Sequence, residues 1–405
     1  MIKWHLNKNG QRLDCFLMKN TEALSSYTAQ GSTLDLKKLK KITGINFSLI
    51  DYLSQQLPGN IDQMYLLVLN SGELLGCASV QLVNFYFNSY INQSLVNRSK
   101  FVDRIFKLGL LRLGKLFNGK ILVLGNLLLT GVRVDWIQPE WETLSENRWW
   151  EEIMDSLLDA SDFDSGEFSG MAILSKGEDV AETGSKTSGW QHFAIEPVMH
   201  IRGMNRWKNI DAYYHDLRSR YRKKINQVLA GSQGLRVVKF NREDIIGHQA
   251  RIMELFTEIL NSSSYNLLHP EFNFFSELQE IDELDYHLCG IFDDGELVAF
   301  YSWFNYNNTT EGHYLGYEKS KNQEYDLYKF ILLKLVEQAI QNNSDKLYLG
   351  RTATIVKADL GADALPSLVS VKPFSKLRSF LLPIYYKAFY RSQRIRSRNV
   401  FKSKG

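Results

Sequence analysis

The stretch EGHYLGYEKSKNQEYDLYKFILLKLVEQAIQNNSDKLYLG, residues 311–350, sets the expected architecture, because it places an apolar helix between two strands. Within it, Tyr325–Gln341 is apolar around most of the helix circumference and keeps one narrow polar stripe. The stripe consists of Lys334, Glu337, Gln338 and Gln341. Such a helix is buried on most sides, so we expect it to pack across a sheet, between the strand before it and the strand after it.

The strand before this helix carries the first candidate site. Alternation along residues 311–318 predicts that Glu311, His313 and Tyr317 share one face and line one cleft, with Tyr314 on the other face. A histidine is able to take a proton from an attacking amine, and a tyrosine is able to return one to a leaving group. A purely structural histidine is the alternative.

Two β-hairpins with similar turns predict a duplicated unit. The first pairs Met64–Asn70 with Leu74–Phe87 around NSGE, and the second pairs His287–Phe292 with Leu297–Tyr306 around DDGE. Each turn leads into Gly-Glu-Leu. Because short hairpins also converge by chance, an accidental likeness is the alternative.

Strands that alternate with helices predict a mixed α/β protein of the α+β class. We expect three parts: residues 1–196, residues 197–366, and a basic aromatic tail, residues 367–405. The tail holds ten Lys and Arg, and no acidic residue follows Asp363. This charge suits an anionic membrane surface, although a solvated tail, or one packed on the domain, is the alternative.

Composition points to a globular, reduced protein. The chain has 405 residues, 44% of them hydrophobic, a net charge of +3 and three cysteines without paired spacing. The most apolar stretch, Ile121–Val132, is too short to span a bilayer, and residues 1–14 lack the apolar run of a signal peptide. We therefore expect a cytoplasmic protein, peripheral at most on the inner face of the membrane.

Several common enzyme signatures are absent from the sequence. There is no phosphate-binding P-loop, no Gly-x-Ser-x-Gly elbow, no His-Glu-x-x-His pair and no Gly-x-Gly-x-x-Gly after a strand. These absences argue against ATPases, serine hydrolases, zinc proteases and dinucleotide enzymes. We expect no metal.

One predicted helix, Asp211–Ala230, carries a dense group of cations. They are Arg218, Arg220, Arg222, Lys223 and Lys224. Arginine offers forked donors to phosphate, so an anion site for a cofactor or lipid phosphate is one interpretation. A solvated face is the other.

Three stretches resemble the Fem-like branch of the GNAT acyltransferases. They are WKNIDAYYHDLRSRYRKKI (207–225), GHYLGYEKSKNQEYDLYKFILLKLVEQAI (312–340) and LGRTATIVKADLGA (349–362). Shorter matches are GN at 125–126 and EPVMHI at 196–201. The resemblance covers about Met64–Ala362 and implies tandem GNAT-like domains that transfer an acyl or aminoacyl group to an amine.

In this family the strand Gly312–Glu318 would splay from Lys346–Gly350, and the gap would hold the pantetheine arm of a thioester. Backbone N–H groups of the first strand would stabilise the oxyanion. Arg351 and Lys357 would stand at the opening, to bind a phosphate or carboxylate, or, for Lys357, to protonate a leaving thiolate. A structural ion pair with Asp359 or Asp363 is the alternative.

The sequence departs from the family at the turn that grips the pyrophosphate of CoA. GNAT enzymes have a glycine-rich turn there, whereas this chain has SKNQEYD, Ser320–Asp326, with two acidic residues. Acyl-CoA held by other cations, an acyl carrier protein and an aminoacyl-tRNA all remain open as donors.

The sequence therefore predicts an N-acyltransferase that moves an acyl group from acyl-CoA or an acyl carrier protein to an amine of a lipid or cell-envelope precursor. The first alternative is a Fem-type transferase that uses aminoacyl-tRNA on a peptidoglycan peptide, and only this one needs tRNA as a partner. The second is a non-catalytic GNAT-fold binding protein.

Overall fold

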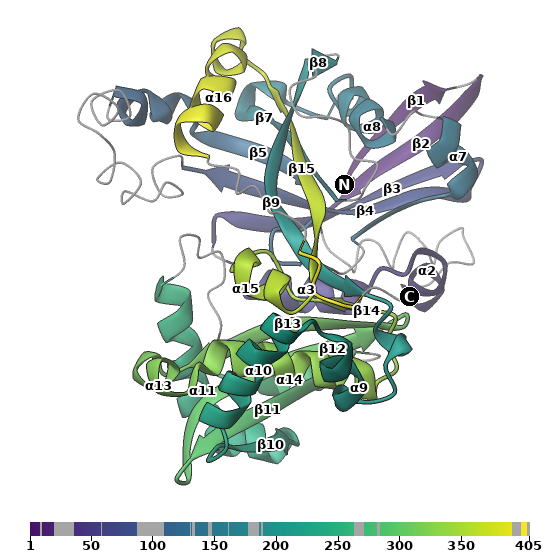
Figure 1. Cartoon of the computed structure of the whole chain (residues 1–405). Helices are drawn as coiled ribbons and strands as arrows, with labels where there is room; N and C mark the ends of the chain where they lie inside the picture. Colours follow the sequence, from purple (N-terminus) through teal and green to yellow (C-terminus); the bar gives the residue numbers. More distant parts are fainter. Residues whose placement is uncertain are drawn as a thin grey trace. The chain divides into compact units, whose positions relative to one another are not determined.

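The computed structural model describes residues 1–8, 10–19, 36–57, 59–86, 109–129, 131, 134–144, 148–160, 162–176, 186–187, 189–262, 271–281, 284–390 and 398–402. The chain forms two compact units (Figure 1). Unit 1 contains Met1–Ile195 and Ser367–Ser392, and unit 2 contains Glu196–Asn266, Pro270–Pro366 and Gln393–Gly405.

Unit 1 is built on a sheet with the strand order β1-β2-β3-β4-β5-β7-β15. All its neighbours are antiparallel except β5 and β7, which are parallel. Its strands are β1 Ile2–Lys8, β2 Gln11–Met18, β3 Ile61–Asn70, β4 Glu73–Phe85, β5 Gly119–Leu124, β6 Asp135–Ile137, β7 Phe168–Lys176, β8 Lys186–Thr187 and β15 Asp363–Pro373. Its helices are α2 Leu36–Thr43, α3 Phe47–Gln55, η1 Gly114–Phe117, α7 Pro139–Leu144, α8 Trp149–Leu157, η2 Ser165–Glu167 and α16 Lys376–Phe389.

Unit 2 has the strand order β9-β14-β13-β12-β11-β10. Only β13 and β14 are parallel, and all other neighbours are antiparallel. Its strands are β9 Trp190–Arg202, β10 Arg236–Phe240, β11 Asp285–Asp293, β12 Glu296–Tyr306, β13 Thr309–Tyr317 and β14 Lys346–Tyr348. Its helices are η3 Met204–Arg206, α9 Ile210–Asp216, α10 Ser219–Gly231, α11 Arg242–Ser262, α12 Phe274–Leu278, α13 Lys319–Tyr325, α14 Leu327–Gln341 and α15 Thr354–Asp359. β9 and β15 each begin in one unit and end in the other.

The two predicted hairpins share their geometry in detail. Each closes on two residues with positive φ, Ser71 and Gly72 in the first and Asp294 and Gly295 in the second, as a type I′ turn requires. Each also has a register shift two pairs before the turn, at Val68/Leu69 and at Ile291/Phe292. In both units a third antiparallel strand and then a parallel strand follow the hairpin. The mixed α/β fold is thus built twice on one plan.

The enclosed helix is α14, and it lies in the main core of unit 2. Nine of its residues are buried, among them Phe330, Leu332 and Val336. They pack with strand residues such as Trp303 and Leu347 in one apolar cluster. The burial predicted from the narrow polar stripe is therefore confirmed.

The cationic helix predicted at Asp211–Ala230 is two helices, so that prediction is wrong in one respect. The chain is extended at Leu217 and Arg218, between α9 and α10. Leu217 pairs with Phe401 there, and the Arg218 amide donates to the Val400 carbonyl at 2.9 Å. Backbone bonds to a distant segment outweigh the local helical preference.

Two further segments differ from expectation. The predicted turn Ser320–Asp326 is the short helix α13, which ends at Asp326 in the left-handed conformation. The predicted tail is not one part, because residues 367–392 belong to unit 1 and the rest to unit 2. Residues 391–397 and 403–405, with several of the tail's cations, lie outside the described residues.

Helix α11 packs on the sheet of unit 2 through a glycine. A Cβ atom added at Gly316 would lie 2.7 Å from the Leu255 carbonyl carbon and 2.8 Å from the Phe256 amide nitrogen. Both are backbone atoms of α11, so they yield only if the helix moves. Gly316 is thus required by close backbone approach.

We expect Gly316→Ala to lower the free energy of unfolding by about 1–3 kcal/mol, because the added methyl group overpacks this contact. The measurement is urea unfolding followed by circular dichroism. Gly247→Ala is the matched control, since a Cβ there, also on α11, meets no atom within 4 Å. Equal stability of the two variants would contradict the close packing.

Candidate functional site

Strands β13 and β14 pair only briefly and then part. The pairs are Thr309 with Lys346, Thr310 with Leu347, and Glu311 with Tyr348. β13 continues to Tyr317, but beyond Glu311 no described strand pairs with it on this side. The chain after β14 stays instead with β9, where the Leu349 amide donates to the Met199 carbonyl at 2.9 Å. The splay implied by the family resemblance is present.

A β-bulge interrupts β13 immediately beyond this point. His313 and Tyr314 together stand opposite Ser302 of β12, between the pairs Trp303–Gly312 and Tyr301–Leu315. The Ser302 hydroxyl donates to the Tyr314 carbonyl at 3.0 Å and accepts from the Tyr314 amide at 3.1 Å. The Ser302 side chain thus bonds the amide and carbonyl of Tyr314, which the bulge leaves without partners in the β12–β13 ladder.

The bulge overturns the predicted sharing of one face by Glu311, His313 and Tyr317. Because one extra residue shifts the alternation, Tyr317 lies on the α14 side of the sheet, with its ring 6.2 Å from that of Tyr328. His313 and Tyr314 lie on the opposite side, in contact with Phe304 and Phe256 respectively.

Glu311 is a buried carboxylate at the last pair before the strands part. It is 3% exposed and accepts a hydrogen bond from the Tyr306 hydroxyl at 2.9 Å. Its negative charge raises, after burial itself, the pKa values of Tyr306, Tyr314 and Tyr348. An acid surrounded by three phenols is a polar site inside a largely aromatic environment.

His313 lies near Glu311 but in a different environment. Both of its ring nitrogens are buried and have no hydrogen-bond partner among the residues that the structure describes. Burial alone lowers the pKa of the imidazole to about 3. A base this weak is poorly matched to an ammonium substrate, which argues against His313 as the group that removes the proton. Glu311, the carboxylate at the last pair before the strands part, is the other candidate base.

Lys357 is a buried lysine on α15. Its side chain is 3% exposed, and its ammonium nitrogen lies 3.8 Å from the place that a Cβ at Gly350 would occupy, at the end of β14. No hydrogen bond or ion pair of this ammonium is found with the residues that the structure describes. Burial lowers its pKa to about 7, so both protonation states are populated near neutral pH.

The predicted alternative is an ion pair of these cations with Asp359 or Asp363, and neither Arg351 nor Lys357 pairs with Asp359 among the described residues. For Arg351, the pair with Asp363 stays a prediction. Asp359 binds Lys224 at 2.9 Å and also Arg398. Arg351 donates to the Glu196 carbonyl at 2.6 Å. Helix α15, which carries Lys357, is therefore tied through Asp359 to α10 and to the C-terminal segment.

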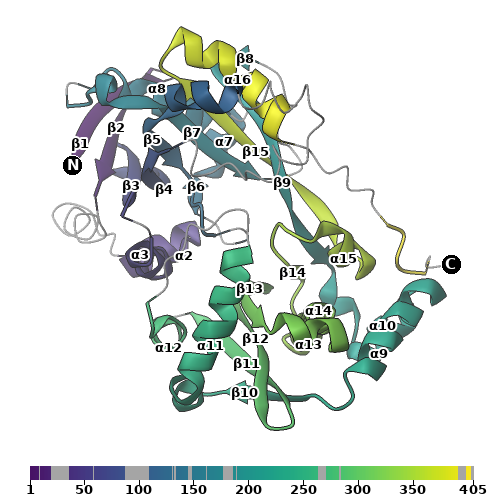
Figure 2. The same ribbon diagram turned by 90° about the vertical axis from the view of Figure 1, so that its left-hand side faces the viewer.

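A groove of about 390 Å³ is lined by residues of α10, the junction of α13 and α14, and α15. Figure 2 labels these helices. Its lining includes Tyr221, Lys224, Asp326, Lys329, Val356 and Asp359, all of them described residues. Lys224 is paired with Asp359, and Lys329 with Asp326. The groove has the size of a ligand site, yet its lysines are already neutralised.

The N-terminus of α14 borders this groove, and a side chain of the preceding helix, α13, caps it. The Tyr328 amide donates to the Asn322 side-chain oxygen at 2.9 Å. This amide is one of the donors that a pyrophosphate would need at a helix N-terminus. The departure seen in the sequence thus has a structural counterpart.

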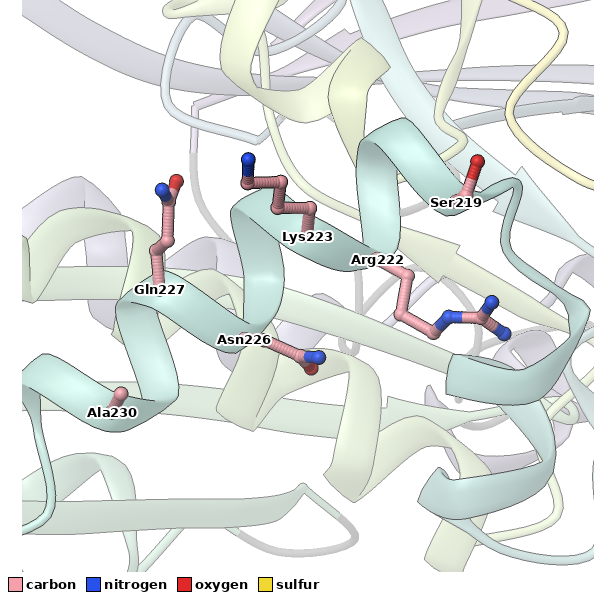
Figure 3. Close-up of a pocket in the computed structure, with 6 residues that line it drawn as sticks. All are labelled: Ser219, Arg222, Lys223, Asn226, Gln227 and Ala230. Carbon is pink, nitrogen blue, oxygen red and sulfur yellow. The ribbon is translucent and has the colours of Figure 1, made fainter.

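The predicted cations of α10 do not form one cluster. Arg218 donates to the Phe401 carbonyl at 3.1 Å, and Lys224 is paired with Asp359. Arg222 and Lys223 extend from the outer face of α10 with Ser219, Asn226, Gln227 and Ala230 (Figure 3). No ion pair of either is found within the described part of the chain. Gln227 lines both this surface and the groove.

Sequence reasoning missed three residues of the site. Ser302 holds the bulge, Tyr306 donates to Glu311, and Asn322 caps α14. Asn322 lies in the predicted turn Ser320–Asp326, and Ser302 and Tyr306 lie in the predicted hairpin strand Leu297–Tyr306, but no local pattern signals the role of any of the three. Among the described residues, no group of three His, Cys, Asp or Glu side chains is placed to hold a metal ion, and no helix is long and apolar enough to cross a membrane.

The structure is similar to several solved structures, at low sequence identity. L-PGS from Bacillus licheniformis matches with a TM-score of 0.48 and 10% identity, over 92% of this chain and 98% of that one. A tandem GNAT protein from the clavulanic acid biosynthesis pathway matches at 0.47 and 10%, over 90% and 100%. FemX matches at 0.46 and 10%, over 81% and 90%. No protein-family profile and no curated protein matches the sequence. At this identity none of these similarities assigns a substrate or a residue role.

The lowered pKa of Lys357 predicts a pH-dependent stability. The folded value is about 7 and the ordinary value 10.5, so between these limits the unfolded chain binds more protons than the folded chain. The free energy of unfolding, relative to that of Lys357→Met, therefore rises with pH by about 1.4 kcal/mol per unit across this window.

Urea unfolding at several pH values measures this difference. Ile355→Met is the control, because Ile355 is a neighbour on α15, 63% exposed and without a titratable group. Its curve should run parallel to that of the unchanged protein. A parallel curve for Lys357→Met as well would mean that the ammonium is not desolvated.

Proposed function

We propose that the protein is an N-acyltransferase that moves an acyl group from a thioester, acyl-CoA or an acyl carrier protein, to an amine of a lipid or cell-envelope precursor. The observation that carries this proposal is the parting of β13 and β14 beyond the pair Glu311–Tyr348. An acyl-pantetheine arm is extended and narrow, and the freed edge of β13 offers it backbone groups of the kind that stabilise an oxyanion.

The proposed chemistry assigns two proton transfers to two buried groups. The Glu311 carboxylate takes a proton from the substrate ammonium, and the amine nitrogen then forms a bond to the thioester carbonyl carbon. Backbone N–H groups of β13 stabilise the tetrahedral oxyanion. The nitrogen of the tetrahedral intermediate loses its second proton to solvent, and when the C–S bond breaks the Lys357 ammonium gives a proton to the leaving thiolate. Glu311 then releases its proton to solvent, and Lys357 takes one from solvent.

In this mechanism Tyr306 is a positioning residue, because its hydroxyl binds Glu311 directly. Tyr314 and Arg351 line the proposed donor and acceptor region, and His313 shapes its apolar wall. Tyr317 contributes to the α14 side instead. These roles extend the predicted site with the bulge taken into account.

Of the two thioester donors, we favour one that a macromolecule carries, the acyl carrier protein, over free acyl-CoA. Two observations support this: the α14 N-terminus is capped by Asn322, and the lysines of the groove are paired with Asp326 and Asp359. An acyl carrier protein would bring its phosphopantetheine arm without needing a pyrophosphate grip. Arg222 and Lys223, on the neighbouring face of α10, would meet its acidic surface.

A second candidate function rests on the same two cations. Arg222 and Lys223 would bind the phosphates of an aminoacyl-tRNA equally well, which would make the protein a Fem-type transferase acting on a peptidoglycan peptide. The two proposals differ in donor and acceptor, but they share Glu311, Lys357 and the splayed strands. Both place the reaction in the cytoplasm or at the inner face of its membrane.

The test incubates the protein separately with acyl-CoA, acyl carrier protein and aminoacyl-tRNA, each with lipid amines and with muropeptides, and follows products by mass spectrometry. We expect an N-acylated lipid amine from acyl carrier protein. Product from aminoacyl-tRNA alone would establish the second candidate. If no donor gives a product, the interpretation that stands is a non-catalytic binding protein.

With the productive donor, Glu311→Gln should lower kcat by about 10²–10⁴-fold, because the amide cannot accept the proton. Glu318→Gln is the matched control. It lies at the end of the same strand, where it pairs with Arg251, and should leave kcat unchanged. Equal rates for Glu311→Gln and the unchanged enzyme would remove Glu311 from the mechanism.

A further inference from the structure

Two segments of unit 1, far apart in sequence, pack into one layer. They are helix α16 and the helical stretch 109–117. The Tyr385 hydroxyl donates to the Leu110 carbonyl at 2.6 Å, and its ring meets that of Phe117 edge to face at 4.7 Å. Arg378 donates to the Leu116 carbonyl at 2.5 Å. The inner faces of the two segments are thus in contact with each other.

The outer faces of these segments carry exposed large apolar side chains. Leu113 is 50% exposed, Leu116 37%, Leu377 52% and Phe380 68%. Across the described residues only ten large hydrophobic side chains are this exposed, so four of them fall on two short segments. Apolar side chains concentrated in this way mark an interaction surface rather than ordinary surface scatter.

Exposed cations accompany these apolar side chains. They are Arg112, Lys115, Lys376 and Lys387. None of the four forms an ion pair with a residue that the structure describes. The sequence also has no Asp or Glu between residues 104 and 134 or after Asp363. No acidic group on either segment therefore offsets the positive charge. We call the four apolar and four cationic side chains together the α16 surface.

Exposed leucine and phenylalanine side chains, accompanied by cations that pair with no described residue, match the chemistry of a lipid headgroup layer. Apolar side chains enter the acyl boundary, while lysine and arginine reach anionic phosphates on flexible stems. A nucleic acid would use the cations but not the leucines. From this combination we infer that unit 1 docks through the α16 surface onto a bilayer that contains anionic phospholipid.

The surface differs from the tail that the sequence suggested as the membrane contact. Tyr385 is 4% exposed, and the Tyr386 hydroxyl donates to the Ala194 carbonyl at 2.8 Å, so these aromatic side chains pack on unit 1. Leu113 and Leu116, which the sequence did not single out, replace them. Docking would bring the proposed transferase to its lipid acceptor. In this respect alone the inference rests on the proposed function.

Vesicle flotation tests the docking without any turnover. The full chain should float with phosphatidylcholine vesicles that contain phosphatidylglycerol and stay behind with phosphatidylcholine alone. Lys376→Gln combined with Lys387→Gln should weaken the partition coefficient about tenfold or more, because each lysine near an anionic surface contributes. Leu377→Ser combined with Phe380→Ser should weaken it by a similar factor through lost apolar burial.

A matched control combines Lys208→Glu with Ile246→Ser, which changes one exposed lysine and one exposed apolar residue of unit 2. It should float like the unchanged protein, and thermal unfolding should show all variants folded. The inference would be overturned if the protein did not float, or if all variants floated equally. It would also be overturned if the protein bound tRNA in a way that needs the lysines but not Phe380. Flotation without any acyl transfer would overturn the proposed function alone, and transfer without flotation would overturn the docking alone.

Discussion

Strands β13 and β14 separate after a single short ladder of three pairs, and this separation defines the candidate site of unit 2. β14 leaves β13 because β9 holds it on the other side, and β13 bends away because two of its residues oppose Ser302. The Ser302 hydroxyl takes over both backbone groups of Tyr314, which stabilises the bulge without a third strand. One serine and one short parallel ladder thereby leave the edge of β13 beyond Glu311 without a described strand partner on this side.

Two buried ionisable groups, Glu311 and Lys357, are found near this edge. Glu311 is held by Tyr306 at the point where pairing ends, and Lys357 lies beside Gly350 where β14 ends. Glu311 is hydrogen-bonded where it is buried, whereas the Lys357 ammonium is buried without a partner among the described residues, which is costly. The lysines of the groove between α10, α14 and α15 are paired with Asp359 and Asp326, whereas Arg222 and Lys223 on the neighbouring face of α10 form no ion pair with a described residue. This distribution of charge favours a macromolecular donor over a free nucleotide.

Much of the architecture was predictable from the sequence, because local patterns determine it. Both hairpins follow from their turns, and the enclosed helix follows from its single polar stripe. The bulge was not predictable, since nothing at His313 and Tyr314 signals it and Ser302 lies on another strand. The break at Leu217 was equally hidden, because it depends on Phe401, far along the chain. Alternation assigned the wrong face to Tyr317 for the same reason: a tertiary contact changed a local rule.

In the proposed mechanism, the edge of β13 receives an acyl-pantetheine arm. A crystal structure with a non-transferable thioether analogue of acyl-pantetheine tests it most directly. We expect the analogue between residues 312–317 and Gly350, with its carbonyl oxygen facing backbone amides of β13 and the nitrogen of Lys357 nearby. An analogue bound elsewhere, or strands that close into a continuous ladder, would contradict the account.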